Sequence, residues 1–223
     1  MSYLTPEEVR LFYERNVPKQ DRQRWYEDDA FDRLVAHGKF GSAQAVLEAG
    51  CGTGRFAEIL LRRHLPDHAR YTGLDISPAM LAHAARRLKP WALRVKLKPA
   101  DVTLGLTGHE GSADRVIATY LFDLLPPGHS RALLDEMHRV LRPNGLLCLA
   151  SLTPETDTGD MTIITQLWAF VQRVWPWIVG GCRPVRLRRM LDDGKWEVMV
   201  HETVSPRGLT SEVVVARKKA ADS

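Results

Sequence analysis

Three glycines at alternate positions, placed directly after a short apolar run, constrain this chain more than any other feature. The run 45–47 predicts a buried strand that Glu48 closes, and a helical pattern opens at Arg55. The glycines between them are Gly50, Gly52 and Gly54. Because glycine has no Cβ, such a turn lets a backbone approach a ligand closely, and the helix start adds free N–H groups and a positive dipole end. The pattern is typical of a nucleotide-type cofactor site in an open α/β sheet.

The spacing of the glycines decides which cofactor is expected. A dinucleotide fingerprint, G-x-G-x-x-G, would need its third glycine at residue 55, which is Arg, and no phosphate-loop G-K-[ST] ending follows. An oxidoreductase is therefore the weaker alternative. The pattern E-x-G-x-G-x-G, from Glu48 to Gly54, resembles the first motif of the class I S-adenosylmethionine (SAM)-dependent methyltransferases.

Downstream residues extend this resemblance. Asp75 lies at the end of a predicted strand, 70–74, about 20 residues beyond the glycines, where an acid accepts hydrogen bonds from ribose hydroxyls. Ile76 beside it is expected to contact adenine, and the stretch 73–81 resembles the family's second motif. The resemblance further implies that Asp101 binds the adenine amino group, with capping of a turn as the alternative. The residues expected around SAM are Glu48, Gly50, Cys51, Gly52, Gly54, Asp75, Ile76, Asp101, Val102 and Thr119.

The segment Tyr120-Leu-Phe-Asp123 follows a predicted strand, 113–119, at the edge where open α/β sheets bind ligands. In the resembled family this variable fourth motif faces the transferable methyl group. The [DNS]-P-P-[FYW] pattern of nucleic-acid base methylation is absent, so no nucleic-acid partner is expected. Tyr120, Asp123 and His129 are the catalytic candidates. Alternatively, Tyr120 only lines the pocket and Asp123 caps the next turn.

The sequence from His138 to Ser151 points to one branch of the family. A predicted helix over 133–141, an Arg-Pro-Asn-Gly break and an apolar strand over 146–151 resemble small-molecule and lipid methyltransferases of the ubiquinone-biosynthesis-like type. The acceptor implied is small and apolar or amphiphilic, such as a lipid amine or a quinol-like ring. A small-thiol S-methyltransferase is an alternative. A SAM-binding protein without catalysis is an alternative of another class.

Segments on either side of this core supply the expected acceptor contacts. Thr5 and Glu8 form a capping box, and the helices it opens carry Tyr13 and Tyr26, which either contact substrate or only cover the sheet. The tryptophan-rich stretch 161–179, with Trp168 on its apolar face, is the expected lid. It either packs on the domain or dips into a membrane surface. A basic cluster from Arg183 to Arg189 is either a solvated face or a site for an acidic head group.

The length of 223 residues suits one domain of the α/β class. We expect a Rossmann-like, seven-stranded, mostly parallel sheet with an antiparallel last strand. Its parts are a helical leader (1–42), a SAM-binding core (43–152), a lid (153–190) and a C-terminal hairpin (191–218). Three cysteines without C-x-x-C spacing, and the lack of an apolar signal core, indicate a cytoplasmic chain with peripheral membrane contact at most. No metal-ligand spacing appears, and the sequence sets no oligomeric state.

Overall fold

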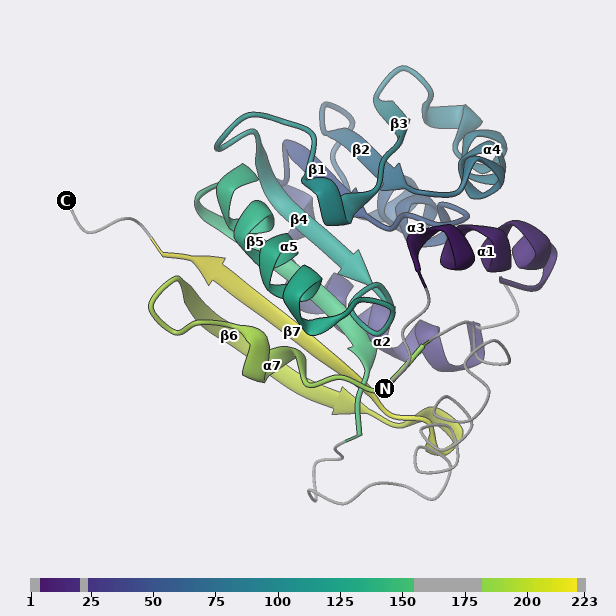
Figure 1. Cartoon of the computed structure of the whole chain (residues 1–223). Coiled ribbons are helices and arrows are strands. Elements are labelled where there is room, and N and C mark those ends of the chain that lie inside the picture. The colour runs from purple at the N-terminus through teal and green to yellow at the C-terminus, as the bar shows by residue number, and fades with distance from the viewer. Residues whose placement is uncertain (1–4, 21–23, 155–181, 220–223) are drawn as a thin grey trace.

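A seven-stranded sheet forms the centre of the computed structural model, which describes residues 5–20, 24–154 and 182–219. The strand order is β3-β2-β1-β4-β5-β7-β6, and β7 runs antiparallel to both of its neighbours (Figure 1). The strands are β1 (Ala45–Ala49), β2 (Arg70–Asp75), β3 (Val95–Pro99), β4 (Ala113–Thr119), β5 (Leu141–Leu152), β6 (Trp196–Val204) and β7 (Ser211–Lys218). The predicted fold class is confirmed, including the antiparallel last strand.

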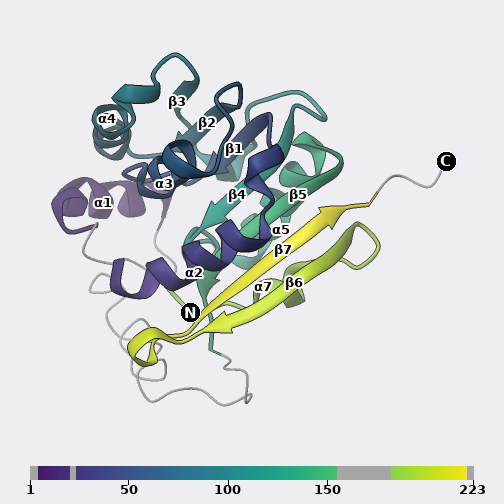
Figure 2. The same ribbon diagram turned by 180° about the vertical axis from the view of Figure 1, so that it is seen from behind.

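Helices cover both faces of this sheet. They are α1 (Pro6–Gln20), α2 (Arg24–His37), α3 (Arg55–Arg63), α4 (Pro78–Arg87), α5 (Pro127–Val140) and the short α7 (Leu187–Met190). Figure 1 shows α5 and α7 in front of the sheet, and the reverse view in Figure 2 shows α2 and α3 on the other face. Successive strand residues alternate between the faces, so Leu47 packs in the cluster under α5, while Val46 packs in the cluster under α2 and α3.

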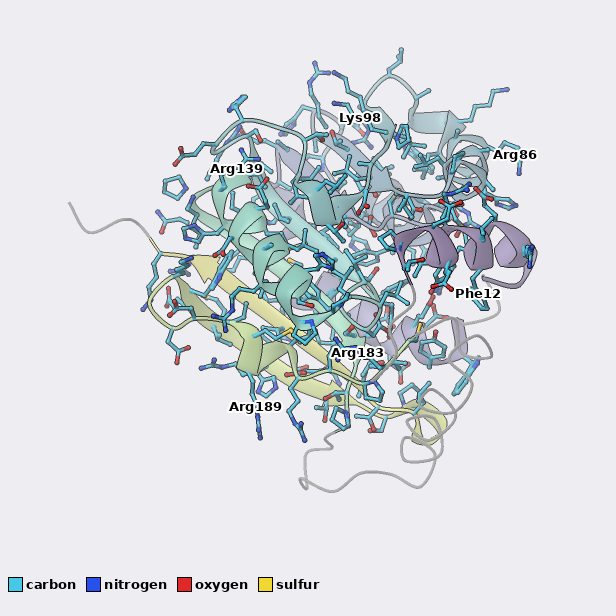
Figure 3. All side chains as sticks on the ribbon, viewed as in Figure 1. Phe12, Arg86, Lys98, Arg139, Arg183 and Arg189 are labelled. Atoms are coloured by element: carbon cyan, nitrogen blue, oxygen red, sulfur yellow. The ribbon has the colours of Figure 1, made fainter. Side chains whose placement is uncertain are left out.

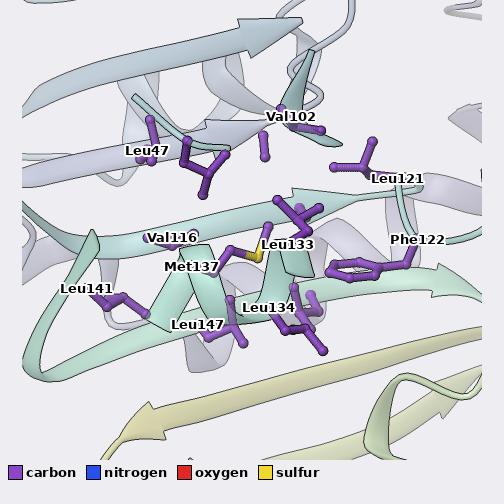
Figure 4. Packing of buried hydrophobic residues seen from close by; sticks show 14 of the residues in the cluster. Leu47, Val102, Val116, Leu121, Phe122, Leu133, Leu134, Met137, Leu141 and Leu147 are labelled. Carbon is purple, nitrogen blue, oxygen red and sulfur yellow. The ribbon is translucent and has the colours of Figure 1, made fainter. Parts of the chain in front are cut away.

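The larger cluster lies between α5 and the sheet. Leu133, Leu134 and Met137 of α5 are buried in it together with strand residues such as Val116 and Leu147 (Figure 4). Burying one such side chain contributes about 1.5–3 kcal/mol relative to leaving it exposed, so this contact fixes α5 against β4 and β5. The segment that joins the end of β4 to α5 is thereby held at the carboxyl edge of the sheet.

Some predicted boundaries were wrong, each for a local reason. The helix predicted over 133–141 begins at Pro127, since proline suits the first helical position, and it ends at Val140. The Arg-Pro-Asn-Gly break is the bulged start of β5, where the register with β4 shifts. Strand β1 continues past Glu48 to Ala49, which pairs with Leu74 of β2. The 3-10 turn Lys89–Trp91 precedes β3, and Leu93 between them is fully exposed.

The leader helix α1 lies beside the carboxyl edge of the parallel strands (Figure 1). Its predicted capping box is confirmed, because the Thr5 N–H donates to Glu8 Oε2 at 2.8 Å and the Glu8 N–H donates to Thr5 Oγ1 at 3.3 Å. The box fixes the start of α1, and α1 contacts α4. The leader therefore stands over the edge where the glycine turn ends β1.

Candidate active site

A cavity of about 380 Å³ lies at the carboxyl edge of the sheet, which is a volume within the range of small-molecule sites. It brings together residues from α1, α2, the glycine turn and the ends of β2 and β4. Of the residues expected around SAM, the lining includes Glu48, Gly50, Cys51, Gly52, Asp75, Ile76, Asp101, Val102 and Thr119. Of the acceptor and catalytic candidates, it includes Tyr13, Tyr26, Tyr120 and His129.

The glycines of the turn differ in what they face. Gly52 has φ +51°, and a Cβ added there would meet nothing within 4 Å, so the missing side chain leaves room for a ligand. Gly54 has φ +73°, and its Cβ would lie 3.0 Å from the Cβ of Ala84. Gly54 therefore allows α3 to pack against α4. Gly54 is not among the described residues that line the cavity, and its expected cofactor contact stays a prediction.

Backbone donors hold the carboxylate of Asp75 in one orientation. Its Oδ2 accepts the Gly52 N–H at 2.8 Å, and its Oδ1 accepts the Ser77 N–H at 2.9 Å. Burial raises the pKa of Asp75, while these backbone hydrogen bonds act in the opposite direction. Ser77 also caps α4 through the Met80 N–H, so the same short segment fixes both the acid and the helix.

Glu48 is a second buried acid at the cofactor end of the cavity. Its Oε2 accepts a hydrogen bond from the hydroxyl of Tyr71 on β2. Burial raises the pKa of Glu48 to about 8, the Tyr71 hydrogen bond opposes that rise, and the nearby Asp75 adds to it. Glu48 is therefore held mainly in its neutral, protonated form at pH 7.

Asp101 caps a turn and also lines the cavity. Its Oδ1 accepts the Thr103 N–H at 2.9 Å and the Thr103 hydroxyl at 2.6 Å, and so caps the 3-10 turn Val102–Leu104. Asp101 and Val102 also line the cavity. The capping role is thus present, and it is compatible with a contact to a ligand.

Tyrosines from three separate segments form the other end of the cavity. Tyr120, which has φ +52°, uses its hydroxyl to contact the Ser211 Oγ at 2.9 Å and the Tyr26 carbonyl at 3.3 Å. The rings of Tyr26 and Tyr120 meet edge to face with centroids 5.4 Å apart. The Tyr13 hydroxyl lies 3.6 Å from the Cys182 Sγ. Burial raises the pKa of all three phenols well above the usual value, so they stay neutral at physiological pH.

Asp123 lies behind this end rather than on the cavity wall. It is fully buried, and it does not cap α5, whose N-cap is Pro126. The capping alternative was therefore wrong, because the turn after β4 continues through Leu124 and Leu125 before the helix begins. Burial raises the pKa of Asp123 to about 7, while Ser151 and Arg183 lower it in part.

The basic cluster does not converge on the cavity. The Arg183 guanidinium donates to the Leu125 carbonyl, and its backbone N–H donates to the Asp123 carbonyl at 3.0 Å. Arg188 pairs with Asp193 at 2.8 Å, and Arg189 projects outward from α7 (Figure 3). Arg183 is not among the described residues that line the cavity, and its expected contact with an acceptor stays a prediction. Trp168 and the stretch 161–179 lie outside the described residues.

The family of the chain follows from this geometry together with comparisons to known proteins. A family model described as "Methyltransferase domain" matches residues 46–145, which span β1, the glycine turn and Asp75. Residues 46–145 form a class I methyltransferase domain. The match covers the cofactor end of the cavity, while the tyrosines of α1 and α2 precede it.

Relatives of this methyltransferase domain are found in sequence and in structure. Malonyl-[acyl-carrier protein] O-methyltransferase of Paenibacillus sp. (strain JDR-2) is 33% identical over 113 residues, which is 50% of this chain and 40% of the relative. Trans-aconitate 2-methyltransferase of Methylobacterium nodulans is 35% identical, over 55% of this chain and 43% of the relative. The chain thus spans about half the length of the curated relatives it matches.

Similar solved structures support the fold. The N-methyltransferase NodS from Bradyrhizobium japonicum WM9, in complex with S-adenosyl-L-homocysteine (SAH), has a TM-score of 0.70 and 17% identity, over 96% of this chain and all of that one. At this level of identity the likeness concerns the fold alone, and the methyltransferase domain here shares its overall architecture.

Sequence reasoning missed an ion pair that joins the leader to the methyltransferase domain. Arg55 donates to Glu27 Oε2 at 2.8 Å, also contacts the Asp28 carboxylate, and stands 5.0 Å from the centre of the Phe31 ring. Glu27 and Arg55 both line the cavity. The only signal in the sequence was that Arg55 occupies the position where a dinucleotide fingerprint has glycine.

Two further features concern only the residues that the structure describes. Their His, Cys, Asp and Glu side chains form no group of three or more that is suited to holding a metal ion. None of their helices combines the length and the apolar character that crossing a bilayer requires.

Proposed function

We propose that the protein transfers a methyl group from SAM to a small apolar or amphiphilic acceptor. One observation carries this proposal: a single cavity joins the glycine turn and Asp75, at one end, to Tyr13, Tyr26 and Tyr120, at the other. In open α/β sheets this edge is the usual place for ligands. A cofactor and an acceptor bound in one cavity are held in the proximity that group transfer needs.

The residues present suit SAM at the glycine end. Gly52 leaves open space where a side chain would stand, and Asp75 is held by two backbone donors so that its remaining acceptor capacity is available to a ribose. Ile76 and Val102 offer apolar contacts for an adenine, and Asp101 offers a carboxylate for its amino group. The rest of the cavity wall at this end is formed by Glu48, Cys51 and Thr119.

The chain's contribution to the chemistry is alignment and exclusion of water. When bound, SAM supplies a methyl group on a sulfonium, and sulfur keeps the electron pair of the broken bond as that methyl moves to the acceptor. Leu121, Leu124 and Leu125 make the wall after β4 apolar, so a bound acceptor is shielded from water. A proton that methylation makes acidic is given up to solvent once the product has left the cavity.

The placement of the catalytic candidates Tyr120, Asp123 and His129 favours acceptors that need little help from a general base. The Tyr120 hydroxyl is already bonded to Ser211 and Tyr26, and Asp123 lies behind the wall. His129 is on the exposed first turn of α5, at the cavity mouth. A thiol is partly ionised near neutral pH and its thiolate is a good nucleophile, so a small thiol is the alternative acceptor to a lipid amine, which must first lose a proton.

Calorimetry tests the cofactor part of the proposal. We expect SAM and SAH to bind, and NAD not to bind. Asp75→Ala is expected to weaken SAM binding about tenfold or more, because a hydrogen bond to a charged group contributes about 1.5–3 kcal/mol. Asp67→Ala is the matched control, since the Asp67 side chain is fully exposed. Equal SAM affinity in the two variants would remove Asp75 from the site, and tight binding of NAD would contradict the proposal.

A further inference from the structure

Arg87, in the last turn of α4, is bonded to the glycine turn of the candidate site. Its Nη1 donates to the Thr53 carbonyl oxygen at 3.0 Å and to the Thr53 Oγ1 at 2.7 Å. Thr53, which stands between Gly52 and Gly54, is buried and lines the cavity. Arg87 is not among the described residues that line it. A side chain behind the cavity wall therefore helps to fix where a part of that wall lies.

The Arg87 guanidinium is itself held by a neighbouring helix. Its Nε lies 3.3 Å from Glu58 Oε2 of α3, and Glu58 Oε1 also accepts a hydrogen bond from Arg62 Nη2 at 2.6 Å. The Arg87 side chain is only 18% exposed, so water has limited access to these contacts. Separate nitrogens of one planar group thus serve Thr53 and Glu58, whereas a lysine ammonium would have to serve both with a single nitrogen.

The glycines on either side of Thr53 make this part of the turn easy to deform. Gly52 has φ +51° and Gly54 has φ +73°, and glycine adopts a wider range of backbone angles than other residues. The Gly54 N–H belongs to the same peptide group as the Thr53 carbonyl, and it donates to the Cys51 carbonyl at 2.9 Å. Arg87 and Cys51 therefore hold this peptide group at its two polar ends, and rotating the group would break the bonds at both.

Helix α4 is bonded to the cofactor end of the cavity at both of its own ends. At its start, the N-cap Ser77 donates its N–H to Asp75 Oδ1, and Asp75 Oδ2 accepts the Gly52 N–H. At its other end, Arg87 donates to Thr53. The helix thus sets the glycine turn relative to the acid that is expected to bind the ribose.

We propose that Arg87 is a positioning residue for SAM, which holds the peptide group between Thr53 and Gly54 so that the turn has its binding conformation before the cofactor arrives. The inference rests on the proposed function, because it requires SAM at the glycine end of the cavity. A ligand that meets a loop already in its bound conformation avoids the cost of ordering that loop. Loss of the Arg87 side chain therefore weakens SAM binding although Arg87 is not part of the cavity wall.

Calorimetric titration of SAH into the full chain tests this role with a matched pair of variants. Arg87→Met and Arg86→Met both remove one positive charge from the last turn of α4, but Arg86 is exposed (Figure 3). We expect Arg87→Met to bind SAH about fivefold or more weakly, because bonds from a charged donor to the turn are lost, and Arg86→Met to match the wild type. Equal affinities in the two variants would overturn the inference. A wild type that does not bind SAH would instead refute the proposed function.

A milder variant separates the geometry of the guanidinium from its charge, and it decides the question if Arg87→Met does not fold. Arg87→Lys keeps the positive charge and offers a single nitrogen to Thr53 and Glu58. We expect its SAH affinity to lie between those of Arg87→Met and the wild type. Wild-type affinity in Arg87→Lys would show that charge alone is enough, and would overturn the proposed hold on the turn.

Hydrogen exchange of the protein without ligand distinguishes positioning of the turn from a general loss of stability. The Gly54 amide reports on the turn, and the Leu88 amide, which donates to the Ala84 carbonyl at 2.8 Å, reports on the end of α4. In the Arg87 variants we expect faster exchange at Gly54 than in the wild type, little change at Leu88, and slower exchange at Gly54 once SAH is bound. Unchanged exchange at Gly54, or an equal increase at both amides, would overturn the inference.

Discussion

At the residue scale, the site is dominated by acids held out of water. Glu48, Asp75 and Asp123 all have raised pKa values, and burial is the largest cause for each. For Glu48 the folded-state pKa, about 8, lies above its ordinary value of 4.5, so folding favours the neutral form. The stabilisation of the fold that comes from keeping Glu48 neutral is fully present below pH 4.5 and is lost as the pH rises through 8. The protein thus keeps an acid at a position where it weakens the unliganded fold at alkaline pH.

Glu48→Gln removes the free-energy cost of keeping an ionisable acid at this buried position. The amide keeps an oxygen for the Tyr71 hydroxyl and cannot ionise, so the variant is expected to exceed the wild type in free energy of unfolding at pH 8 by at least about 1 kcal/mol. At pH 5 the difference should be much smaller. Urea unfolding at both pH values measures it, with the exposed Glu197→Gln as control. Identical changes with pH in the wild type and Glu48→Gln would contradict the raised pKa.

Single residues could be predicted when a local sequence pattern marks them, and could not when their contacts join distant parts of the chain. Asp75 was predictable, because its spacing from the glycines is a local pattern, and the structure places it beside Gly52. The bond of Tyr120 to Ser211 joins residues far apart in the chain, and no local pattern encodes it. The packing of Gly54 against Ala84 on another helix could not be predicted for the same reason, and its expected cofactor contact stays a prediction.

At the scale of elements, the glycine turn serves two neighbours. Gly52→Ala is expected to fold at a cost of about 1–2 kcal/mol for the left-handed backbone, and to bind SAM at least tenfold more weakly because its methyl group enters the cavity. Gly54→Ala carries a similar backbone cost and also meets Ala84, so it should lose more stability. Thermal unfolding and SAM calorimetry on both variants separate the effects. Normal SAM binding by folded Gly52→Ala would contradict the placement of the cofactor.

The leader helix α2 is tied to the start of α3 by Arg55. Removing one partner of a buried ion pair costs about 3–5 kcal/mol, because the other charge stays buried, and the Arg55 and Glu27 side chains are only 12% and 10% exposed. Arg55→Met should therefore be strongly destabilising in urea unfolding. Arg62→Met, which breaks an exposed pair with Glu58, should cost no more than about 0.5 kcal/mol. Equal losses in the two variants would show that the Arg55 pair contributes no more than a surface pair.

Elements with a strong hydrophobic period were predicted best. The strand over 113–119 was predicted with its observed ends, and α5 was found but begun too late, because Pro127 gives no apolar signal. The expected substrate contacts from the lid and the basic cluster rested on composition alone. Of these, the described Arg183 turns its guanidinium to a backbone carbonyl.

At the scale of the whole molecule, the sheet order brings the ends of β1, β2 and β4 to one edge, and the leader covers that edge (Figures 1 and 2). The resemblance carried by the glycine turn and the motifs after it was enough to predict this fold, and the cofactor contacts that it implies stay predictions. The tyrosine end is assembled from α1, α2, the turn after β4 and Cys182, which are distant in sequence. Sequence alone could name Tyr13 and Tyr26 but could not say that both line one cavity with Tyr120.

Transfer of label from SAM carrying an isotopically labelled methyl group tests the central claim most directly. The purified chain is incubated with labelled SAM and a fractionated small-molecule extract, with Asp75→Ala as the matched control. The account predicts that the wild type moves label into a small apolar or amphiphilic compound and forms SAH in equal amount, and that the variant does so far more slowly at limiting SAM. Recovery of SAM bound but unchanged, with no labelled product in any fraction, would contradict methyl transfer and leave a SAM-binding protein.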